Sequence, residues 1–127
     1  MAVKFKIPSG VRREAVYGME LKQKFGYGGG DRTMQINSLL RSHTQVGLKT
    51  AIAIYKYYAR HAPVDPKGIN FDNRKRPSKG YIMWKLMGGD AGHQWSRKLR
   101  RGTKDHIQKS INMVKDTRGV VNNGLVR

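Results

Sequence analysis

The stretch 84-WKLMGGDAGHQWSRKLRR-101 decides the fold, because its glycine-rich centre separates two segments of helical composition. Glycine-rich loops ahead of helices often bind phosphate groups, and such a loop would indicate a nucleotide-binding enzyme. A P-loop requires the pattern GxxxxGK[ST] after a strand, with a lysine directly after the second glycine. Here Gly88 and Gly89 follow a helical segment, and no lysine lies between Gly88 and Arg97. The stretch therefore predicts a corner between two helices.

Asp90 also favours a corner over a phosphate site. At the N-cap of the second helix its carboxylate is expected to accept the free backbone N–H groups, and its negative charge would repel an anion. The glycines before it end the first helix, and the glycine after it permits close helix packing. The two tryptophans are expected to close over one core, with base stacking by an exposed tryptophan as the alternative. The predicted corner consists of Trp84, Gly88, Gly89, Asp90, Gly92 and Trp95.

Outward from the corner, apolar residues repeat at helical spacing through most of the chain. This spacing predicts helices over 9–25, 31–40, 48–62, 78–87 and 90–101, and a last helix from residue 103 with its apolar residues inward. The expected N-caps are Ser9, Asp31, Ser78, Asp90 and Thr103. The expected inward residues of the third helix are Leu48, Ala51, Ile52, Tyr55, Tyr58, Ala59 and Ala62, and those of the last are Ile107, Ile111 and Val114.

The sequence thus predicts an all-α fold, a compact bundle of about five short helices with a basic loop over 63–77. A single helical domain is expected over 1–116. From 117 to 127 the chain has no helical period, and we expect a flexible C-terminal tail.

Charge points to the kind of partner. The chain has 26 Lys and Arg against 8 Asp and Glu, a net charge of +18 over 127 residues. Such an excess opposes compaction, so a polyanion is the expected partner, and nucleic acid is the first choice. A membrane surface is not expected, because the charge is spread over several elements. A solvated basic surface without a target is the alternative.

The basic residues are densest late in the chain. Between Arg74 and Lys115 twelve Lys and Arg stand against two Asp. The trio 74-RKR-76 and the cluster 97-RKLRR-101 suit contacts to phosphates more than contacts to base edges. The predicted nucleic-acid-binding residues are Arg74, Lys75, Arg76, Lys79, Arg97, Lys98, Arg100, Arg101 and Lys104.

The sequence resembles a small domain that tailed bacteriophages encode, alone or fused to head-morphogenesis proteins. The resemblance covers 15–100, with the corner motif as its specific part, and it rests on the runs 36-INSLLRSHTQVGLKTAIAIYKYYARHAPVDPKG-68 and 77-PSKGYIMWKLMGGDAGHQWSRKL-99. Three positions depart from the family pattern, namely Gly47, Met83 and Met87. The resemblance implies a phage origin and a helical fold, and it supplies no catalytic or ligand-binding residue.

No pattern of catalytic residues appears. The four histidines form no HxxxH or HExxH pair, and the chain has no cysteine. His61 and Asp65 are expected to staple a helix end to its loop, with metal ligation or general-base work as the alternative. The segment 31–61 also has the size of a helix-turn-helix, for which an ordinary helical hairpin is the alternative. We therefore expect no enzyme activity, no metal and no cofactor.

These observations lead to a functional hypothesis. We expect a non-enzymatic phage protein that binds nucleic acid, DNA rather than RNA, mainly through phosphates, in the phage head or on the genome. The main alternative is a virion structural protein that docks on an acidic capsid or portal surface. A host-takeover protein and a metal-dependent nuclease rank below these two. The expected location is the virion or the cytoplasm of the infected bacterium.

Overall fold

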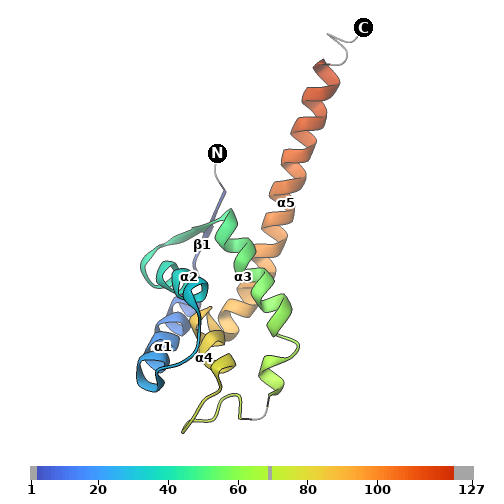
Figure 1. Ribbon diagram of the computed structural model, residues 1–127. Helices are drawn as coiled ribbons and strands as arrows, with labels where there is room; N and C mark the ends of the chain where they lie inside the picture. The colour runs from blue at the N-terminus through green and yellow to red at the C-terminus, as the bar shows by residue number, and fades with distance from the viewer. Residues whose placement is uncertain (1–2, 69, 122–127) are drawn as a thin grey trace.

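The computed structural model describes the backbone of residues 3–68 and 70–121, and the side chains of this range as far as Lys115. Five α-helices, one short 3₁₀-helix and two strands occur in these residues (Figure 1). The predicted all-α class is confirmed. In chain order the elements are β1 Lys4–Lys6, α1 Ser9–Phe25, α2 Asp31–Ser42, β2 Gln45–Gly47, α3 Leu48–His61, η1 Asp65–Lys67, α4 Lys79–Leu86 and α5 Gly89–Val121.

Backbone geometry sets the ends of the first two helices. Gly26 has a φ of 78°, a left-handed conformation that glycine adopts without strain, and its N–H bonds to the carbonyl of Lys22. Ser9 and Asp31 were predicted as N-caps, and this is wrong for both. The caps are Pro8 and Gly30, and neither helix start has a side-chain cap bond. Asp31 instead lies in the first turn of α2, where its charge complements the helix dipole.

A small antiparallel sheet holds the start of the chain against the α2–α3 connection. Phe5 of β1 lies opposite Val46 of β2, and Val46 is buried. Neither strand was predicted from the sequence, because three residues are too few to show an alternating pattern. The sheet gives the connection a partner elsewhere in the chain, whereas a helix-turn-helix joins its helices by a tight turn alone.

Helix α3 is central, but its buried face differs from the predicted stripe. The buried residues are Ala51, Ile54, Tyr57 and Tyr58, while Ala59 is exposed. The face is rotated by roughly one residue, about 100° around the helix axis. The reason is that α3 packs against α5 on one side and against the rest of the core on another.

Two predicted helices form one. The helices predicted over 90–101 and from Thr103 are the single α5, which is 33 residues long. Thr103 is therefore a buried mid-helix residue and not a cap. Next to it Gly102 lies against Phe5, because a Cβ at this glycine would be 2.6 Å from the Phe5 ring. One glycine with a packing role does not end a helix.

The second half of α5 extends beyond the body of the molecule (Figure 1). Ile107, Ile111 and Val114 were predicted to face inward, but they are 44%, 42% and 54% exposed. They have the predicted helical spacing, yet no other described element covers them. The helix continues through Val121, past the start of the predicted tail, and residues 122–127 of that tail lie outside the described residues.

Candidate nucleic-acid interface

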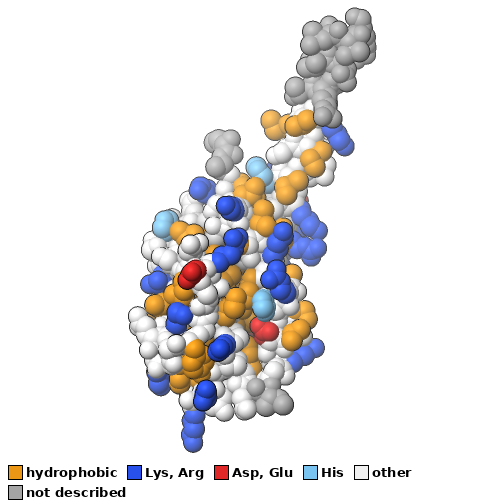
Figure 2. All heavy atoms as spheres, viewed as in Figure 1, with side chains coloured by type: hydrophobic (Ala, Val, Ile, Leu, Met, Phe, Trp, Pro, Cys, Tyr) orange, Lys and Arg blue, Asp and Glu red, His pale blue; other side chains and the backbone are white. Residues whose placement is uncertain are grey.

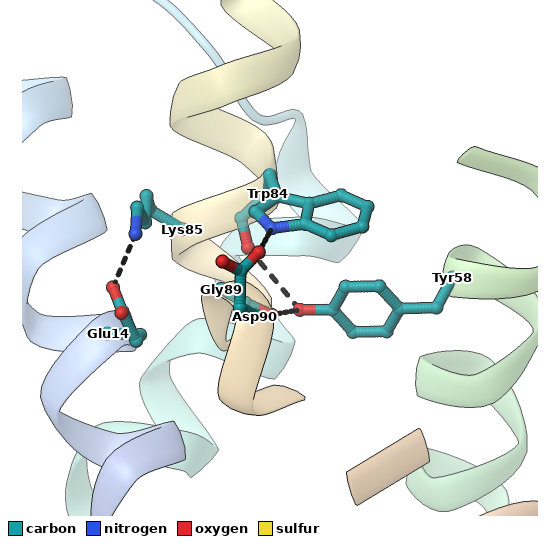
Figure 3. A network of polar contacts seen from close by, with 6 residues as sticks. All are labelled: Glu14, Tyr58, Trp84, Lys85, Gly89 and Asp90. Carbon is teal, nitrogen blue, oxygen red and sulfur yellow. Dashed lines mark hydrogen bonds and ion pairs between the residues drawn. The ribbon is translucent and has the colours of Figure 1, made fainter. Parts of the chain in front are cut away.

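The corner between α4 and α5 is held by hydrogen bonds within the fold (Figure 3). Gly88 and Gly89 have φ values of 124° and 62°, so glycine suits both positions of the turn. Across this turn Trp84 Nε1 donates a hydrogen bond of 3.0 Å to Oδ1 of Asp90. Asp90 lies in the first turn of α5, which begins at Gly89, so its prediction as the N-cap is wrong. Its carboxylate still places a negative charge in the first turn of α5, which disfavours an anion there.

Tyr58 joins α3 to the corner. Its hydroxyl donates to the carbonyl oxygen of Gly89 at 2.9 Å, with the carbonyl oxygen of Trp84 at 3.4 Å. Burial raises the pKa of the Tyr58 hydroxyl, which therefore remains a donor. Gly92 makes this contact possible, because a Cβ there would lie 2.5 Å from the Tyr58 hydroxyl oxygen. The predicted role of Gly92 in close helix packing is confirmed.

Both tryptophans belong to the core, as predicted. Trp84 is 2% exposed and Trp95 is 6% exposed, and the two pack in the same hydrophobic cluster. The ring of Trp84 meets Tyr58 edge-on, with 4.8 Å between ring centroids. Neither ring is available for stacking on a base, so the alternative role does not fit.

Several cationic side chains are engaged inside the fold. Lys85 forms an ion pair of 2.9 Å with Glu14 of α1, and Arg12 donates to the carbonyl oxygens of Arg41 and His43. Lys22 donates to the carbonyl oxygen of Gly28 at 2.5 Å. These contacts connect loops and helices. Because these cationic groups already have internal partners, they are less available to an external anion.

The nine predicted nucleic-acid-binding side chains are in a different situation. All nine are exposed, and none forms an ion pair or a side-chain hydrogen bond within the part of the chain that the structure describes. Five of them lie on α5, namely Arg97, Lys98, Arg100, Arg101 and Lys104. Figure 2 shows Lys and Arg side chains gathered where α5 leaves the rest of the fold.

Helical spacing orders the cluster on α5. Arg97, Arg100, Arg101 and Lys104 stand at i, i+3, i+4 and i+7, so they share one side of the helix. This side is opposite Trp95 and Leu99, which are buried in the core. We call these four residues the α5 basic face.

The structure does not place the loop trio in this face. Arg74, Lys75 and Arg76 lie between η1 and α4, at the end of the molecule away from the projecting half of α5 (Figure 1). Oδ1 of Asn73 accepts the backbone N–H groups of Lys75 and Arg76, which gives the trio a defined turn. The predicted site is therefore two separate basic surfaces.

A third basic group was missed. Arg32 of α2 and Lys56 and Arg60 of α3 line one pocket between these helices. Lys56 and Arg60 are at i, i+4 on one helix, which the sequence shows, but their proximity to Arg32 depends on helix packing. At the edge of the same pocket the predicted staple is confirmed, since Nδ1 of His61 lies 2.9 Å from Oδ2 of Asp65.

Two kinds of feature are absent from the described residues. No group of three or more His, Cys, Asp or Glu side chains there is arranged to hold a metal ion. None of the described helices has the length and apolar character needed to cross a bilayer. The chain matches no protein-family model, no curated protein and no solved structure.

Proposed function

We propose that the chain binds double-stranded nucleic acid, DNA in the first instance, through phosphate contacts of the α5 basic face and without catalysis. The observation that carries the proposal is the arrangement of Arg97, Arg100, Arg101 and Lys104. They are exposed, share one side of a helix, and have no acidic partner among the described side chains. Cations left free in this way interact with an external polyanion.

The dimensions of the face suit a duplex. A helix rises about 1.5 Å per residue, so Arg97 and Lys104 are about 10 Å apart along the axis. A duplex carries one charge per about 1.7 Å of its axis, so such a face meets several phosphates. Guanidinium groups also bind phosphate oxygens in a bidentate manner, and three of the four residues are arginines.

The biological setting is part of the proposal. The resemblance to a tailed-phage domain supports a role in the phage head or on the genome, either in the virion or in the infected cell. The second candidate is a virion protein whose basic face docks on an acidic capsid or portal surface. The projecting half of α5 favours this candidate, because an exposed apolar side suits a protein partner better than a duplex.

A salt titration of DNA binding tests the proposal. Fluorescence anisotropy is measured with two unrelated duplexes at salt concentrations from about 50 to 200 mM. Four phosphate contacts predict a slope of about −3.6 in the plot of log K against log salt, equal for both sequences. Replacing the four residues of the α5 basic face by Gln is expected to abolish most of this slope.

The loop trio provides the comparison variant. Replacing Arg74, Lys75 and Arg76 by Gln removes three charges from the other basic surface and is expected to leave most of the slope in place. No duplex binding at low salt, or a slope that the α5 variant leaves unchanged, would overturn the proposal. A quantitative count of the chain in purified particles then tests the docking candidate.

A further inference from the structure

The pocket between α2 and α3 lies apart from the α5 basic face. It is lined by Ala53, Tyr57 and Arg60 of α3, whereas the hollow on the α5 side is lined by Tyr55, Ala59 and Ala62. The two sets lie on opposite sides of α3, because positions two apart, such as Ala53 and Tyr55, are separated by about 200° around a helix axis. The pocket has a volume of about 310 Å³, at the lower end of the range for small-molecule sites.

The rim of the pocket is cationic. Arg32 comes from α2, and Lys56 and Arg60 come from α3, so two elements converge on one space. All three side chains are exposed, and no Asp or Glu belongs to the described lining. None of the three forms an ion pair within the described residues. Three convergent cations without a counter-charge in the lining favour a multivalent anion.

The inner wall adds an aromatic ring and a histidine. Tyr57 lines the pocket and is 7% exposed, and its hydroxyl oxygen has no hydrogen-bond partner among the described residues. The hydroxyl oxygen is enclosed by the fold, so Tyr57 contributes its ring to the wall of the pocket. Burial, and then the charge of Asp65, raises the pKa of Tyr57, which keeps the hydroxyl a donor. His61 uses Nδ1 to contact Asp65, and Nε2 is its remaining polar atom.

We propose that this pocket binds a phosphate monoester, with Arg32, Lys56 and Arg60 as the cationic groups. A terminal phosphate carries more charge than a backbone phosphodiester, and three cations match it better than one. The pocket exceeds a bare phosphate in size and leaves room for part of the attached group. Two sources share this chemistry, the phosphorylated end of a nucleic-acid strand and a free nucleotide. The site goes beyond the proposed function, because it recognises a terminus and not the length of a duplex.

Single-stranded oligonucleotides with and without a 5′-phosphate test the first source. In anisotropy measurements at fixed salt, the phosphate is expected to improve affinity by about tenfold or more, the factor for one charge-assisted hydrogen bond. Arg60→Gln is expected to remove this preference, and Lys56→Gln to reduce it. Lys49→Gln is the matched control, because it removes one exposed charge from α3 outside the pocket lining.

Chemical-shift perturbation with a deoxynucleoside 5′-monophosphate, and separately with inorganic phosphate, tests the second source. Shifts at α2 and α3 that Arg60→Gln abolishes, without a preference for phosphorylated ends, would assign the pocket to a free nucleotide. The proposal is overturned if neither probe shifts these helices and the 5′-phosphate has no effect, or if Lys49→Gln acts like Arg60→Gln. Salt-dependent duplex binding by the Arg60→Gln protein shows separately whether the α5 basic face functions.

Discussion

The indole of Trp84 and the carboxylate of Asp90 are joined by a hydrogen bond of 3.0 Å across the glycine turn between α4 and α5 (Figure 3). Trp84 is buried, so its N–H would lose its partner if the carboxylate were removed. The bond orients the ring against Tyr58, which in turn holds the backbone of Gly89. The turn is thus held by bonds from both of its flanking helices and from α3.

Asp90→Ala is expected to lower the free energy of unfolding by about 1–2 kcal/mol, because it leaves the Trp84 N–H unpaired. Asp90→Asn keeps an acceptor oxygen and should lower it by less than half of that amount. Urea denaturation of the three proteins measures the difference. Equal losses in both variants would mean that the hydrogen bond does not matter. Affinity for DNA should be unchanged or slightly higher in Asp90→Ala, because a negative charge is removed.

The tryptophans should matter for stability and not for binding. Trp84→Ala and Trp95→Ala are each expected to cost about 3–5 kcal/mol, the usual loss for a large aromatic residue removed from a core. Thermal and urea denaturation provide the measurement. If both variants unfolded like the parent and bound DNA more weakly, the rings would be acting at the surface instead.

Gly92→Ala tests the contact between α3 and α5. The added methyl group would lie 2.5 Å from the Tyr58 hydroxyl oxygen and 3.0 Å from the carbonyl oxygen of Met87. We expect a loss of about 1–3 kcal/mol, typical of overpacking. The control is Gly30→Ala, whose methyl group meets no atom within 4 Å and which should change stability by less than about 1 kcal/mol.

A double-mutant cycle identifies the atom responsible. Tyr58→Phe removes the hydroxyl that the methyl group of Gly92→Ala would strike. The two changes combined should therefore cost less than the sum of the single changes, a coupling of at least about 0.5 kcal/mol. Strictly additive losses would place the strain at the Met87 carbonyl.

Tyr81 should lose its proton only at a higher pH than an exposed tyrosine does. Burial, with a smaller contribution from neighbouring Tyr17, raises the pKa of Tyr81 from 10.0 to about 12. The folded state thus holds the proton more tightly than the unfolded state. The resulting stabilisation is complete below pH 10 and is lost as the pH rises towards about 12. The difference in absorbance at 295 nm between the parent and Tyr81→Phe should show this late titration, and a transition near pH 10 would contradict it.

The features that were predicted correctly from the sequence depend on local signals. Ser78 caps α4 by accepting the N–H of Tyr81, and Gly26 ends α1 in the left-handed conformation. Both effects depend on neighbours in the chain. The strand pair and the rotated face of α3 depend on segments that are distant in the sequence. The packing of Gly102 of α5 against Phe5 likewise joins segments about one hundred positions apart.

The candidate sites show the same difference between local features, which the sequence predicts, and contacts between distant segments, which it does not. The exposure of Arg97, Arg100, Arg101 and Lys104 follows from the pattern of one helix, and the sequence predicts it. The separation of the trio 74–76 from that face is known only from the three-dimensional structure. The convergence of Arg32 with Lys56 and Arg60 is also known only from the structure, because α2 and α3 belong to different apolar patterns. The spacing of residues within one helix thus predicts which of them share a face, but it does not predict which helices lie next to one another.

The length of α5 has a consequence for cooperativity. Among the described side chains of α5, Thr103 is the last that is buried, and those from Lys104 to Lys115 are exposed apart from the half-buried His106. Helices in proteins gain most of their stability from packing, and the described part of this outer segment has little packing. Its amide protons should therefore exchange with solvent through local opening, while those of the packed half exchange only with global unfolding. A partner that covered the outer half would convert α5 into one cooperative unit, and the slowing of exchange would mark the turns it touches.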